Sequence, residues 1–316
     1  MIKYVIKRIL LMIFTLFIII TMCFFLIKLL PNELVPVPGK DYELLLRRRE
    51  LMGYNKPLIE QFFIFCRRTL LGGDWGLSEK LYPAQECWDI FVSKLPATMY
   101  VNLLSMLFSV PLGLGLGIFA ALKKNKWQDH VISTGVMIFI SVPSYVYAFL
   151  VQHYLCFEFG WFPLQLEAST NYFTLSMFVS AIPAILSLSF GTIAGLTRFT
   201  RAELTEVLTS EFMLLARTKG LTKGQATARH ALRNSMVPIF PSILGEFIGI
   251  IGGSLIIEDI FGVPGVGSLY INSVTALDYN MFMLLSAFYC AIGLVSGIII
   301  DLSYGFIDPR IRMGER

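Results

Sequence analysis

Long apolar runs separated by polar segments dominate the pattern of hydrophobic and polar positions along this chain. Six of the runs reach the roughly 20 residues that a helix needs to cross the hydrocarbon core of a bilayer. We therefore predict an all-α integral membrane protein with six transmembrane helices. The runs extend over residues 9–30, 97–122, 131–151, 173–196, 236–257 and 281–306.

The first run follows three basic residues, Lys3, Lys7 and Arg8, as the apolar part of a signal peptide would. It is too long for such a segment, and no small-residue cleavage site follows it. We expect it to be retained as the first transmembrane helix.

Composition agrees with this pattern. Of the 316 residues, 55% are hydrophobic and 15% are charged, and the mean hydropathy of +0.67 lies well on the apolar side of ordinary soluble domains. The net charge of +4 comes mostly from basic residues at the expected cytoplasmic side. It gives no reason to expect a nucleic-acid partner.

The distribution of Lys and Arg predicts the orientation, because short cytoplasmic loops are enriched in both. Residues 197–235 carry seven basic side chains, whereas 152–172 and 258–280 carry none. We predict cytoplasmic termini and an external segment 31–96, whose nine basic residues are balanced by nine acidic ones. The expected organisation is residues 1–30 with the first helix, external loop 31–96, core 97–306 and cytoplasmic tail 307–316.

Motifs for catalysis are missing from the sequence. It has no phosphate-binding G-x-x-x-x-G-K-[ST] loop, no H-E-x-x-H and no G-x-S-x-G. The chain is therefore not expected to be an enzyme or to bind a metal, and the glycine-rich GVPGVGS at 262–268 is interpreted as an external turn. Cys66 and Cys87 share the external segment, and both a disulfide and two free thiols remain open.

Small residues recur every four positions in three of the runs, a spacing that aligns them on one helix face where two backbones can approach closely in lipid. Packing within the chain and packing against a partner chain are both open. The glycines concerned are Gly113, Gly117, Gly245, Gly249, Gly253, Gly293 and Gly297.

Glu246 lies inside the fifth run, where a charge is costly and marks a candidate functional position. Three interpretations remain open: a polar point in a substrate passage, a carboxylate that couples transport to protons, and a hydrated carboxyl near the interface. Asn102, Gln152 and Ser254 are further candidates for the passage, with a packing hydrogen bond as the alternative for each.

The polar stretch 211–235 lies between two apolar runs. Phe212, Leu215, Ala216 and Lys219 have helical spacing, which predicts a short helix that ends at Gly220 in the left-handed conformation. Thr222 and Gln225 fit a capping box that opens a second short helix, and Ser235 is expected to cap the fifth transmembrane helix. Helices this short need a partner surface. Both the lipid interface and a soluble protein below the membrane are candidates.

The stretch ARTKGLTKGQATARHALRNSMVP resembles the cytoplasmic loop of ABC-importer permeases, and more narrowly the B-type permease subunit of dipeptide, oligopeptide and nickel importers. Seven further segments agree in the expected order: YVIKRIL, GGDWGLS, KLPATMYVN, FGWFPL, IEDIFGVPGVGSL, LDYN and DPRIR. The sequence departs from the family at LPNELVPV, which stands where Gly-Asp-Pro is usual, at Leu214 and Leu215, and at Glu246.

The resemblance implies the transmembrane domain of a type I ABC importer in a bacterial cytoplasmic membrane. It implies a homologous second permease subunit, two cytoplasmic subunits that bind ATP and Mg²⁺, and an external binding protein that delivers a peptide; this chain itself would hold no cofactor. A nickel chelate as cargo and an ion-coupled secondary transporter are the alternatives. The expected ATPase-coupling residues are Glu211, Phe212, Leu215, Ala216, Lys219, Gly220, Leu221 and Thr222.

Overall fold

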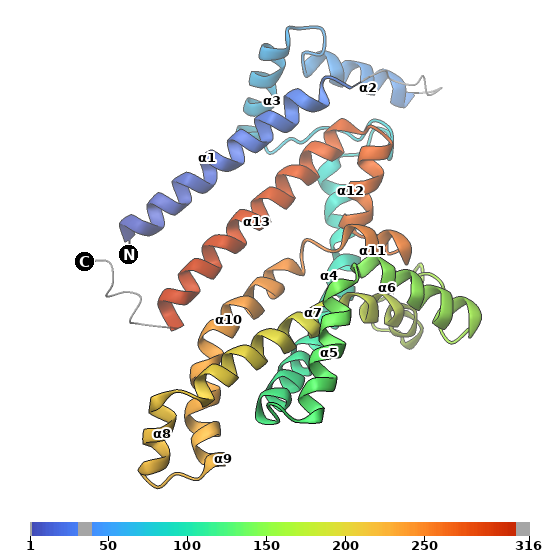
Figure 1. The fold of residues 1–316 in the computed structure, drawn as a ribbon. Coiled ribbons are helices and arrows are strands. Elements are labelled where there is room, and N and C mark those ends of the chain that lie inside the picture. The colour runs from blue at the N-terminus through green and yellow to red at the C-terminus, as the bar shows by residue number, and fades with distance from the viewer. Residues whose placement is uncertain (1, 31–39, 308–316) are drawn as a thin grey trace. The chain divides into compact units, whose positions relative to one another are not determined.

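The computed structural model describes residues 2–30 and 40–307. Within these ranges the chain is helical, and the only strand-like pairing there is a single bridge between Leu77 and Glu86 (Figure 1). In chain order the helices are α1 (Ile2–Ile27), α2 (Lys40–Leu51), α3 (Leu58–Gly72), α4 (Cys87–Leu122), α5 (Trp127–Ser141), α6 (Ser144–Val151), the π-helix η1 (Gln152–Glu158), α7 (Leu175–Leu208), α8 (Glu211–Thr218), α9 (Lys223–Ala226), the π-helix η2 (Thr227–Ala231), α10 (Leu232–Gly249), α11 (Leu255–Ile260), α12 (Val266–Thr275) and α13 (Tyr279–Ile307).

The chain forms two compact units, each built from segments that are separate in the sequence. Unit 1 comprises Met1–Thr98, Gly252–Glu258 and Pro264–Ile298. Unit 2 comprises Met99–Ile251, Asp259–Val263 and Ile299–Arg316. The long helix α4 therefore contributes its first turns to unit 1 and the rest to unit 2.

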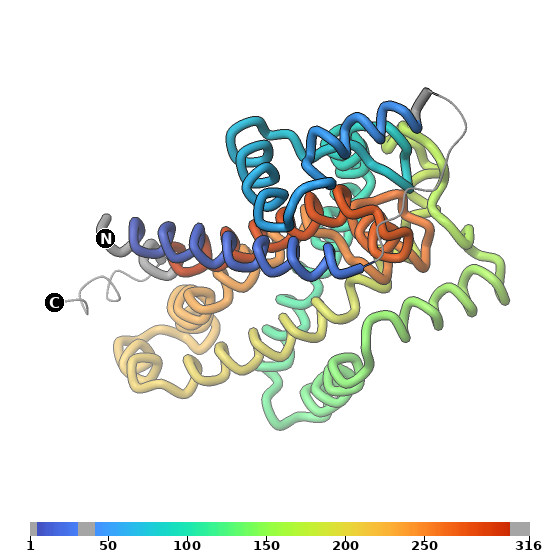
Figure 2. The backbone as a smooth tube through the Cα atoms, turned by 90° about the horizontal axis from the view of Figure 1, so that it is seen from above, coloured from blue at the N-terminus to red at the C-terminus, as the bar shows by residue number. Residues whose placement is uncertain are grey.

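In unit 1, α1, α3 and α13 pack together through an apolar cluster, and α1 lies beside α13 (Figure 2). Phe24 and Ile27 of α1 meet Phe65 of α3 and Tyr279 and Met283 of α13. A second cluster joins the start of α4 to α12 and α13. Cys66 and Cys87 are both free thiols in this unit, so the disulfide alternative is excluded in this structure.

Asp278, just before α13, holds the loop after α3 against the rest of unit 1. Its Oδ2 accepts hydrogen bonds from the Ser78 hydroxyl and from the backbone N–H groups of Glu79, Lys80 and Leu81, at 2.5–3.1 Å. Neither Asp278 nor Ser78 is exposed to solvent. The motifs GGDWGLS and LDYN lie 200 residues apart in sequence, and this hydrogen bond between Ser78 and Asp278 joins them.

Glu258 holds the glycine-rich turn at 262–268 in place by hydrogen bonds, as Asp278 holds the loop after α3. Its Oε2 accepts from the backbone N–H of Gly267, in the first turn of α12, at 2.8 Å, and its Oε1 accepts from the Thr98 hydroxyl at 3.0 Å. A Cβ at Gly265 would lie 2.3 Å from the same carboxylate, so only glycine fits there. Burial raises the pKa of Glu258, while the hydrogen bond from Thr98 lowers it.

In unit 2 the predicted span 131–151 is a bent pair of helices. Helix α5 ends at Ser141, and the segment α6–η1 continues at 98° to it. Pro143 explains the break, because the residue before a proline avoids the helical region, and Val142 is extended with ψ of 128°. The Tyr147 hydroxyl lies against the carbonyls of Phe139 and Val142 at this bend, and its one proton is shared between these two acceptors.

The predicted fifth span, 236–257, also differs from the structure. Helix α10 ends at Gly249, and a turn with Gly253 at φ +68° precedes the short α11. Four of the described helices are long and apolar enough to cross a bilayer, or five if the bent pair counts as one span. The helical membrane fold is confirmed, whereas the count of six is not.

The glycines that were predicted to align on helix faces differ in whether another helix lies close to them. A Cβ at Gly113 would lie 2.9 Å from Leu196 Cβ, and one at Gly117 would lie 2.6 Å from Thr200 Cβ, so α4 and α7 approach closely at both. At Gly245 the nearest atom belongs to Ile300, at 3.1 Å. Gly249, Gly293 and Gly297 have no neighbour within 4 Å of a Cβ, and the prediction that they pack helices stays open. Gly253 lies beyond the end of α10, so it does not belong to that helix face.

We expect Gly117→Ala to destabilise the protein by about 1–3 kcal/mol, because an added methyl group would collide with the backbone carbonyl of Thr197 and with Thr200. Gly115→Ala is the matched control on the same helix, since a Cβ there has no neighbour within 4 Å. Thermal unfolding of the purified protein measures both. Equal unfolding temperatures for the two variants would contradict the close approach of α4 and α7.

Candidate functional site

The polar stretch between α7 and α10 begins with α8 (Glu211–Thr218), which ends in a Schellman motif. The N–H of Leu221 donates to the Ala216 carbonyl at 3.3 Å, and the N–H of Gly220 donates to the Arg217 carbonyl at 3.0 Å. Gly220 has φ of +93°, the left-handed conformation that the sequence predicts at this position. The chain therefore reverses sharply within two residues.

Thr222 then opens the next helix with the predicted capping box. Its hydroxyl accepts from the Gln225 N–H at 3.3 Å, and the Gln225 side chain accepts from the Thr222 N–H at 3.1 Å. The helix continues from α9 through the π-turn η2 into α10 without interruption. The prediction that Ser235 caps a separate helix is wrong: its hydroxyl donates to the Leu232 carbonyl inside a continuous helix.

The apolar side chains of α8 face in two directions. Met213 and Ala216 are buried, whereas Phe212, Leu214 and Leu215 are 41%, 64% and 55% exposed. The predicted apolar face of Phe212, Leu215 and Ala216 is therefore divided. Ala216 packs within the chain, and the three larger side chains remain available to another surface.

The buried side of α8 anchors the whole stretch to the transmembrane helices of unit 2. Met213 and Ala216 join one apolar cluster with Ala121 of α4, Leu204 of α7 and Ala226 of α9. Figure 1 shows α8 and α9 as a compact hairpin at the end of α7 and α10. A force on the exposed face of α8 would thus be transmitted to α4, α7 and α10 through packed side chains.

A cavity of about 680 Å³ lies in the same unit, lined by α7, α10 and Ser144 of α6. Glu246 and Ser242 of α10 line it, and Arg198 of α7 brings a positive charge to the same space. Gly191 and Gly195 also line the cavity, and no atom lies within 4 Å of a Cβ at either position. The missing side chains help to keep the space open.

The other three residues predicted for a passage do not line this cavity. The Gln152 amide donates to the carbonyls of Ile260 and Leu164, at 2.8 and 3.3 Å, which is the packing alternative. Ser254 lies in unit 1, where its carbonyl accepts from the Glu258 N–H. Asn102 is half-buried on α4. Among the four candidates, only Glu246 reaches the cavity.

Sequence reasoning missed several residues that the structure brings into contact. Arg198 was counted only as a basic loop residue, although it lies within α7 and lines the cavity. Asp129 and Arg201 form an ion pair, with Arg201 Nη2 at 2.8 Å from Asp129 Oδ2, that joins α5 to α7. Asp129 and Asp278 lie at or just before the start of a helix, and an acidic residue in such a position is the signal by which the sequence could have identified them.

Potential metal ligands do not cluster in the part of the chain that the structure describes: no group of three or more His, Cys, Asp or Glu side chains could hold an ion there. What the site does offer is one acidic and one basic side chain in the cavity, Glu246 and Arg198, and an exposed apolar face on α8.

Comparisons with known proteins agree with this arrangement. Residues 113–313 match the family described as the inner membrane component of binding-protein-dependent transport systems, and residues 1–102 match the N-terminal domain of such membrane components. The chain is 32% identical over 313 residues to the dipeptide transport system permease protein DppB of Lactococcus lactis subsp. cremoris, with 99% of this chain and 100% of the relative covered.

Two further relatives are also similar along their length. The oligopeptide transport system permease protein OppB of Haemophilus influenzae is 32% identical, with 99% of this chain and 100% of that protein covered. The glutathione transport system permease protein GsiC of Shigella boydii is 30% identical, with 99% of each chain covered.

Solved structures support the fold. A chain of an amino acid ABC transporter aligns with a TM-score of 0.51 at 20% identity, covering 68% of this chain and 92% of its own length. A chain of the MetNI methionine ABC transporter in an inward-facing conformation aligns with a TM-score of 0.50 at 16% identity, covering 68% and 97%. Two family matches that together span nearly the whole chain, and relatives aligned from end to end, lead to one assignment: the chain belongs to the family of inner membrane components of binding-protein-dependent transport systems.

Proposed function

We propose that this chain is the permease subunit of an ATP-driven ABC importer and forms half of the translocation pathway for peptides. The observation that carries the proposal is the end-to-end similarity to permeases named for dipeptide, oligopeptide and glutathione transport. Those names concern the relatives. Peptides are the cargo class that the three names share, which favours a peptide over a nickel chelate here.

The proposed partners are a homologous second permease, two cytoplasmic ATP-binding subunits and an external binding protein. ATP and Mg²⁺ would be bound by the ATP-binding subunits, because this sequence has no phosphate-binding loop. The exposed Phe212, Leu214 and Leu215 on α8 support a docking surface for one of these subunits. An apolar face on a short helix at the end of a long one is suited to a groove on a soluble partner.

In the proposed mechanism, closure of the ATP-binding subunits moves α8. The turn at Gly220 and the capping box at Thr222 keep the angle between α8 and the continuous helix α9–η2–α10 fixed. Movement of α8 then tilts α10, which carries Glu246 into the cavity. Rocking of such helices opens a passage alternately to the two sides of the membrane, as alternating access requires.

Glu246 is proposed to bias which peptides pass. We expect Glu246→Gln to lower the uptake of cationic relative to anionic peptides by about fivefold, as follows from roughly 1 kcal/mol of charge interaction in a hydrated cavity. Glu206→Gln is the matched control, because Glu206 is exposed on α7 but does not line the cavity. Uptake of a charge-varied peptide panel tests this. Unchanged proportions in Glu246→Gln would remove Glu246 from the passage.

The external location of residues 31–96 remains a prediction from the charge pattern, and it can be tested with a single cysteine. Ser78 is unsuitable for labelling, because it is fully buried against Asp278. Asn55 is exposed in the turn between α2 and α3. In a background without native cysteines, we expect Asn55→Cys to react with an impermeant thiol reagent in intact cells. Labelling only after lysis would reverse the topology.

The assembly itself tests the proposed function. An affinity tag on this chain should co-purify a second permease and two ATP-binding subunits from the native host, and ATP hydrolysis by the purified complex should rise when binding protein with peptide is added. A chain that purifies alone, with no ATP hydrolysis in its fractions, would rule out the proposal.

A further inference from the structure

A cavity of about 420 Å³ lies in unit 1, between α1 and α13. Both helices are long and apolar enough to cross a bilayer. Helix α3 and the side chains of Trp75 and Trp88 complete the wall of the cavity, and all the residues that line it belong to unit 1. It shares no residue with α8 or with the cavity at Glu246, so the function proposed above does not use it.

The cavity lies at the depth of lipid acyl chains. It extends along α1 from Ile13 to Thr21 and along α13 from Leu284 to Ala291. At a rise of about 1.5 Å per residue, these stretches lie about 8 to 21 Å from the end of α1 and the start of α13, where the two helices meet. Because a hydrocarbon core is about 30 Å thick, both helices place the cavity mainly in one leaflet. It is the leaflet nearer Lys28, which is the outer one on the predicted topology.

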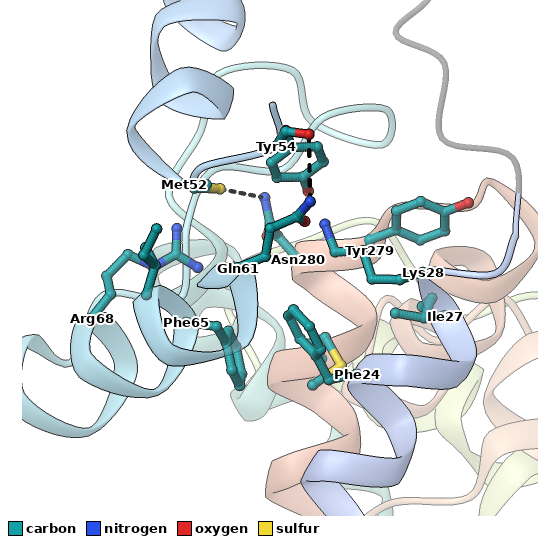
Figure 3. A pocket seen from close by; sticks show the side chains of 12 residues that line it. Phe24, Ile27, Lys28, Met52, Tyr54, Gln61, Phe65, Arg68, Tyr279 and Asn280 are labelled. Atoms are coloured by element: carbon teal, nitrogen blue, oxygen red, sulfur yellow. Dashed lines mark hydrogen bonds between the residues drawn. The ribbon is translucent and has the colours of Figure 1, made fainter. Parts of the chain in front are cut away.

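Aromatic rings separate the cavity from polar side chains at the end of α1. Phe65 of α3 lines the cavity, and its ring lies 5.2 Å, centre to centre, from that of Phe24. Figure 3 shows the two rings side by side, with the polar side chains of Lys28 and Gln61 farther toward the end of α1. The region beyond the rings is polar, as at the surface of a bilayer, whereas the cavity begins about one turn deeper, at Thr21.

The wall of the cavity is apolar. Its two hydroxyl side chains, Thr21 and Thr69, donate to the backbone carbonyls of Phe17 and Asp74, so neither needs a partner in the cavity. The rest of the wall consists of aliphatic and aromatic side chains and the Cys66 thiol. An apolar cavity does not take up water, and an empty one would leave its lining without van der Waals contacts. An apolar occupant is therefore expected.

Part of the wall is open to the outside of the protein. Among the lining side chains, Phe17 of α1, Leu70 of α3 and Trp88 at the start of α4 are 48%, 72% and 51% exposed. The ring of Phe62 on α3 lies 6.1 Å from that of Phe17, which is about 15 Å from the end of α1. Helix α3 therefore reaches alongside α1 into the membrane, and the cavity opens at a depth where lipid tails are present.

The dimensions of the cavity decide which apolar occupant fits. Its volume of about 420 Å³, spread over about 12 Å of α1, corresponds to a mean cross-section of about 35 Å². A helix of a partner chain, with a diameter of about 10 Å or more, would need a cross-section of about 80 Å². A hydrocarbon chain is much thinner. At about 30 Å³ for a group of the size of a water molecule, the cavity holds roughly 14 methylenes.

We propose that this cavity binds one acyl chain of a phospholipid. The chain fills the space that α1, α3 and α13 leave between them, and its contacts hold α3 against the two spanning helices. The proposal needs only the membrane location of α1 and α13, and it goes beyond the transport of peptides.

Photo-crosslinking tests the site. The purified complex is placed in nanodiscs of a phosphatidylcholine that carries a diazirine near the middle of one acyl chain, and after irradiation the modified residues are located by mass spectrometry. Phe17 and Phe14 are a matched pair, because both are exposed on α1 but only Phe17 lines the cavity; Ile20 and Ile18 are a second pair, of which only Ile20 lines it. We expect about fivefold more adduct on the lining member of each pair, because a chain held on three sides stays in contact longer than the mobile lipid outside.

Two substitutions that fill the cavity sharpen the test. Ala287→Phe and Ala291→Phe add a ring at lining positions on α13, and each should lower the adduct yield on Phe17 relative to Phe14 by about fivefold. Val295→Phe is the control, because Val295 is exposed one turn further along α13 and does not line the cavity. It should leave the ratio unchanged.

The unaltered protein keeps the test decisive even if a filled variant does not fold. Adduct yields on Phe17 that only match those on Phe14 would mean mobile lipid around the protein, and would overturn the proposal. Adducts on Phe14 with none on Phe17 and Ile20 would mean that a partner chain covers the cavity, with the same consequence. An unchanged yield on Phe17 in both filled variants would place the acyl chain elsewhere and would also contradict the proposal.

Discussion

Replacing Gly220 by Val is expected to reduce peptide uptake at least tenfold while leaving the amount of protein in the membrane near normal. Gly220 has φ of +93°, a conformation that costs a β-branched residue roughly 1–3 kcal/mol. No atom lies within 4 Å of a Cβ at this position, so the variant suffers backbone strain without a clash. The turn would open, and α8 would lose its fixed angle to α10. Membrane abundance, co-purification of the ATP-binding subunits and uptake are the measurements.

Gly224→Ala is the matched control, because Gly224 lies four residues away inside α9, with open space and an ordinary helical backbone. Leu215→Asp adds a second variant, since Leu215 is exposed and its replacement changes the docking face without disturbing the packed side of α8. Ala216 is unsuited to that purpose, because it is buried within the chain. Normal uptake in both Gly220→Val and Leu215→Asp would favour the alternative in which α8 rests on lipid.

The other large effect is expected in unit 1. Asp278→Ala should destabilise the protein by about 3–5 kcal/mol, because it leaves the buried Ser78 hydroxyl and Glu79 N–H, and the part-buried N–H groups of Lys80 and Leu81, without their acceptor. The midpoint of thermal unfolding should fall by roughly 10 °C. Scanning fluorimetry of the purified protein measures the shift.

Glu60→Ala serves as the control for Asp278→Ala. Glu60 belongs to the same unit, but its side chain is 58% exposed and pairs only with Lys56 one turn away. An i,i+4 pair of this kind contributes a few tenths of a kcal/mol, so its loss should hardly change the midpoint. Similar midpoints for Asp278→Ala and Glu60→Ala would show that the four hydrogen bonds do not hold the loop.

Residues close together in sequence predict the conformation of the turn between α8 and α9 well. Gly220 and the pair of Thr222 with Gln225 act through neighbours within four residues, so their conformations follow from the sequence alone. Which side chains of α8 are buried was harder to predict. Phe212 and Leu215, as well as Met213 and Ala216, are spaced by three residues, and only the position of α4 and α7 decides which pair is buried.

Hydropathy predicts where the chain is apolar but not where a helix bends or stops. Pro143 divides the third run, and the glycines at 252 and 253 follow the early end of α10, although neither interrupts the apolar pattern. Long-range polar contacts are harder still. Asp278 and Ser78 lie 200 residues apart, and the hydrogen bond between them depends on the fold of the whole unit.

The central claim of the proposed function is that ATP, and not an ion gradient, drives the uptake of peptide. Proteoliposomes that contain the whole complex, supplied with binding protein and a labelled dipeptide, should accumulate peptide only when ATP is present on the side of the ATP-binding subunits, and vanadate should stop the uptake. Peptide accumulation without ATP, driven by an imposed proton or sodium gradient, would contradict the account and identify an ion-coupled transporter instead.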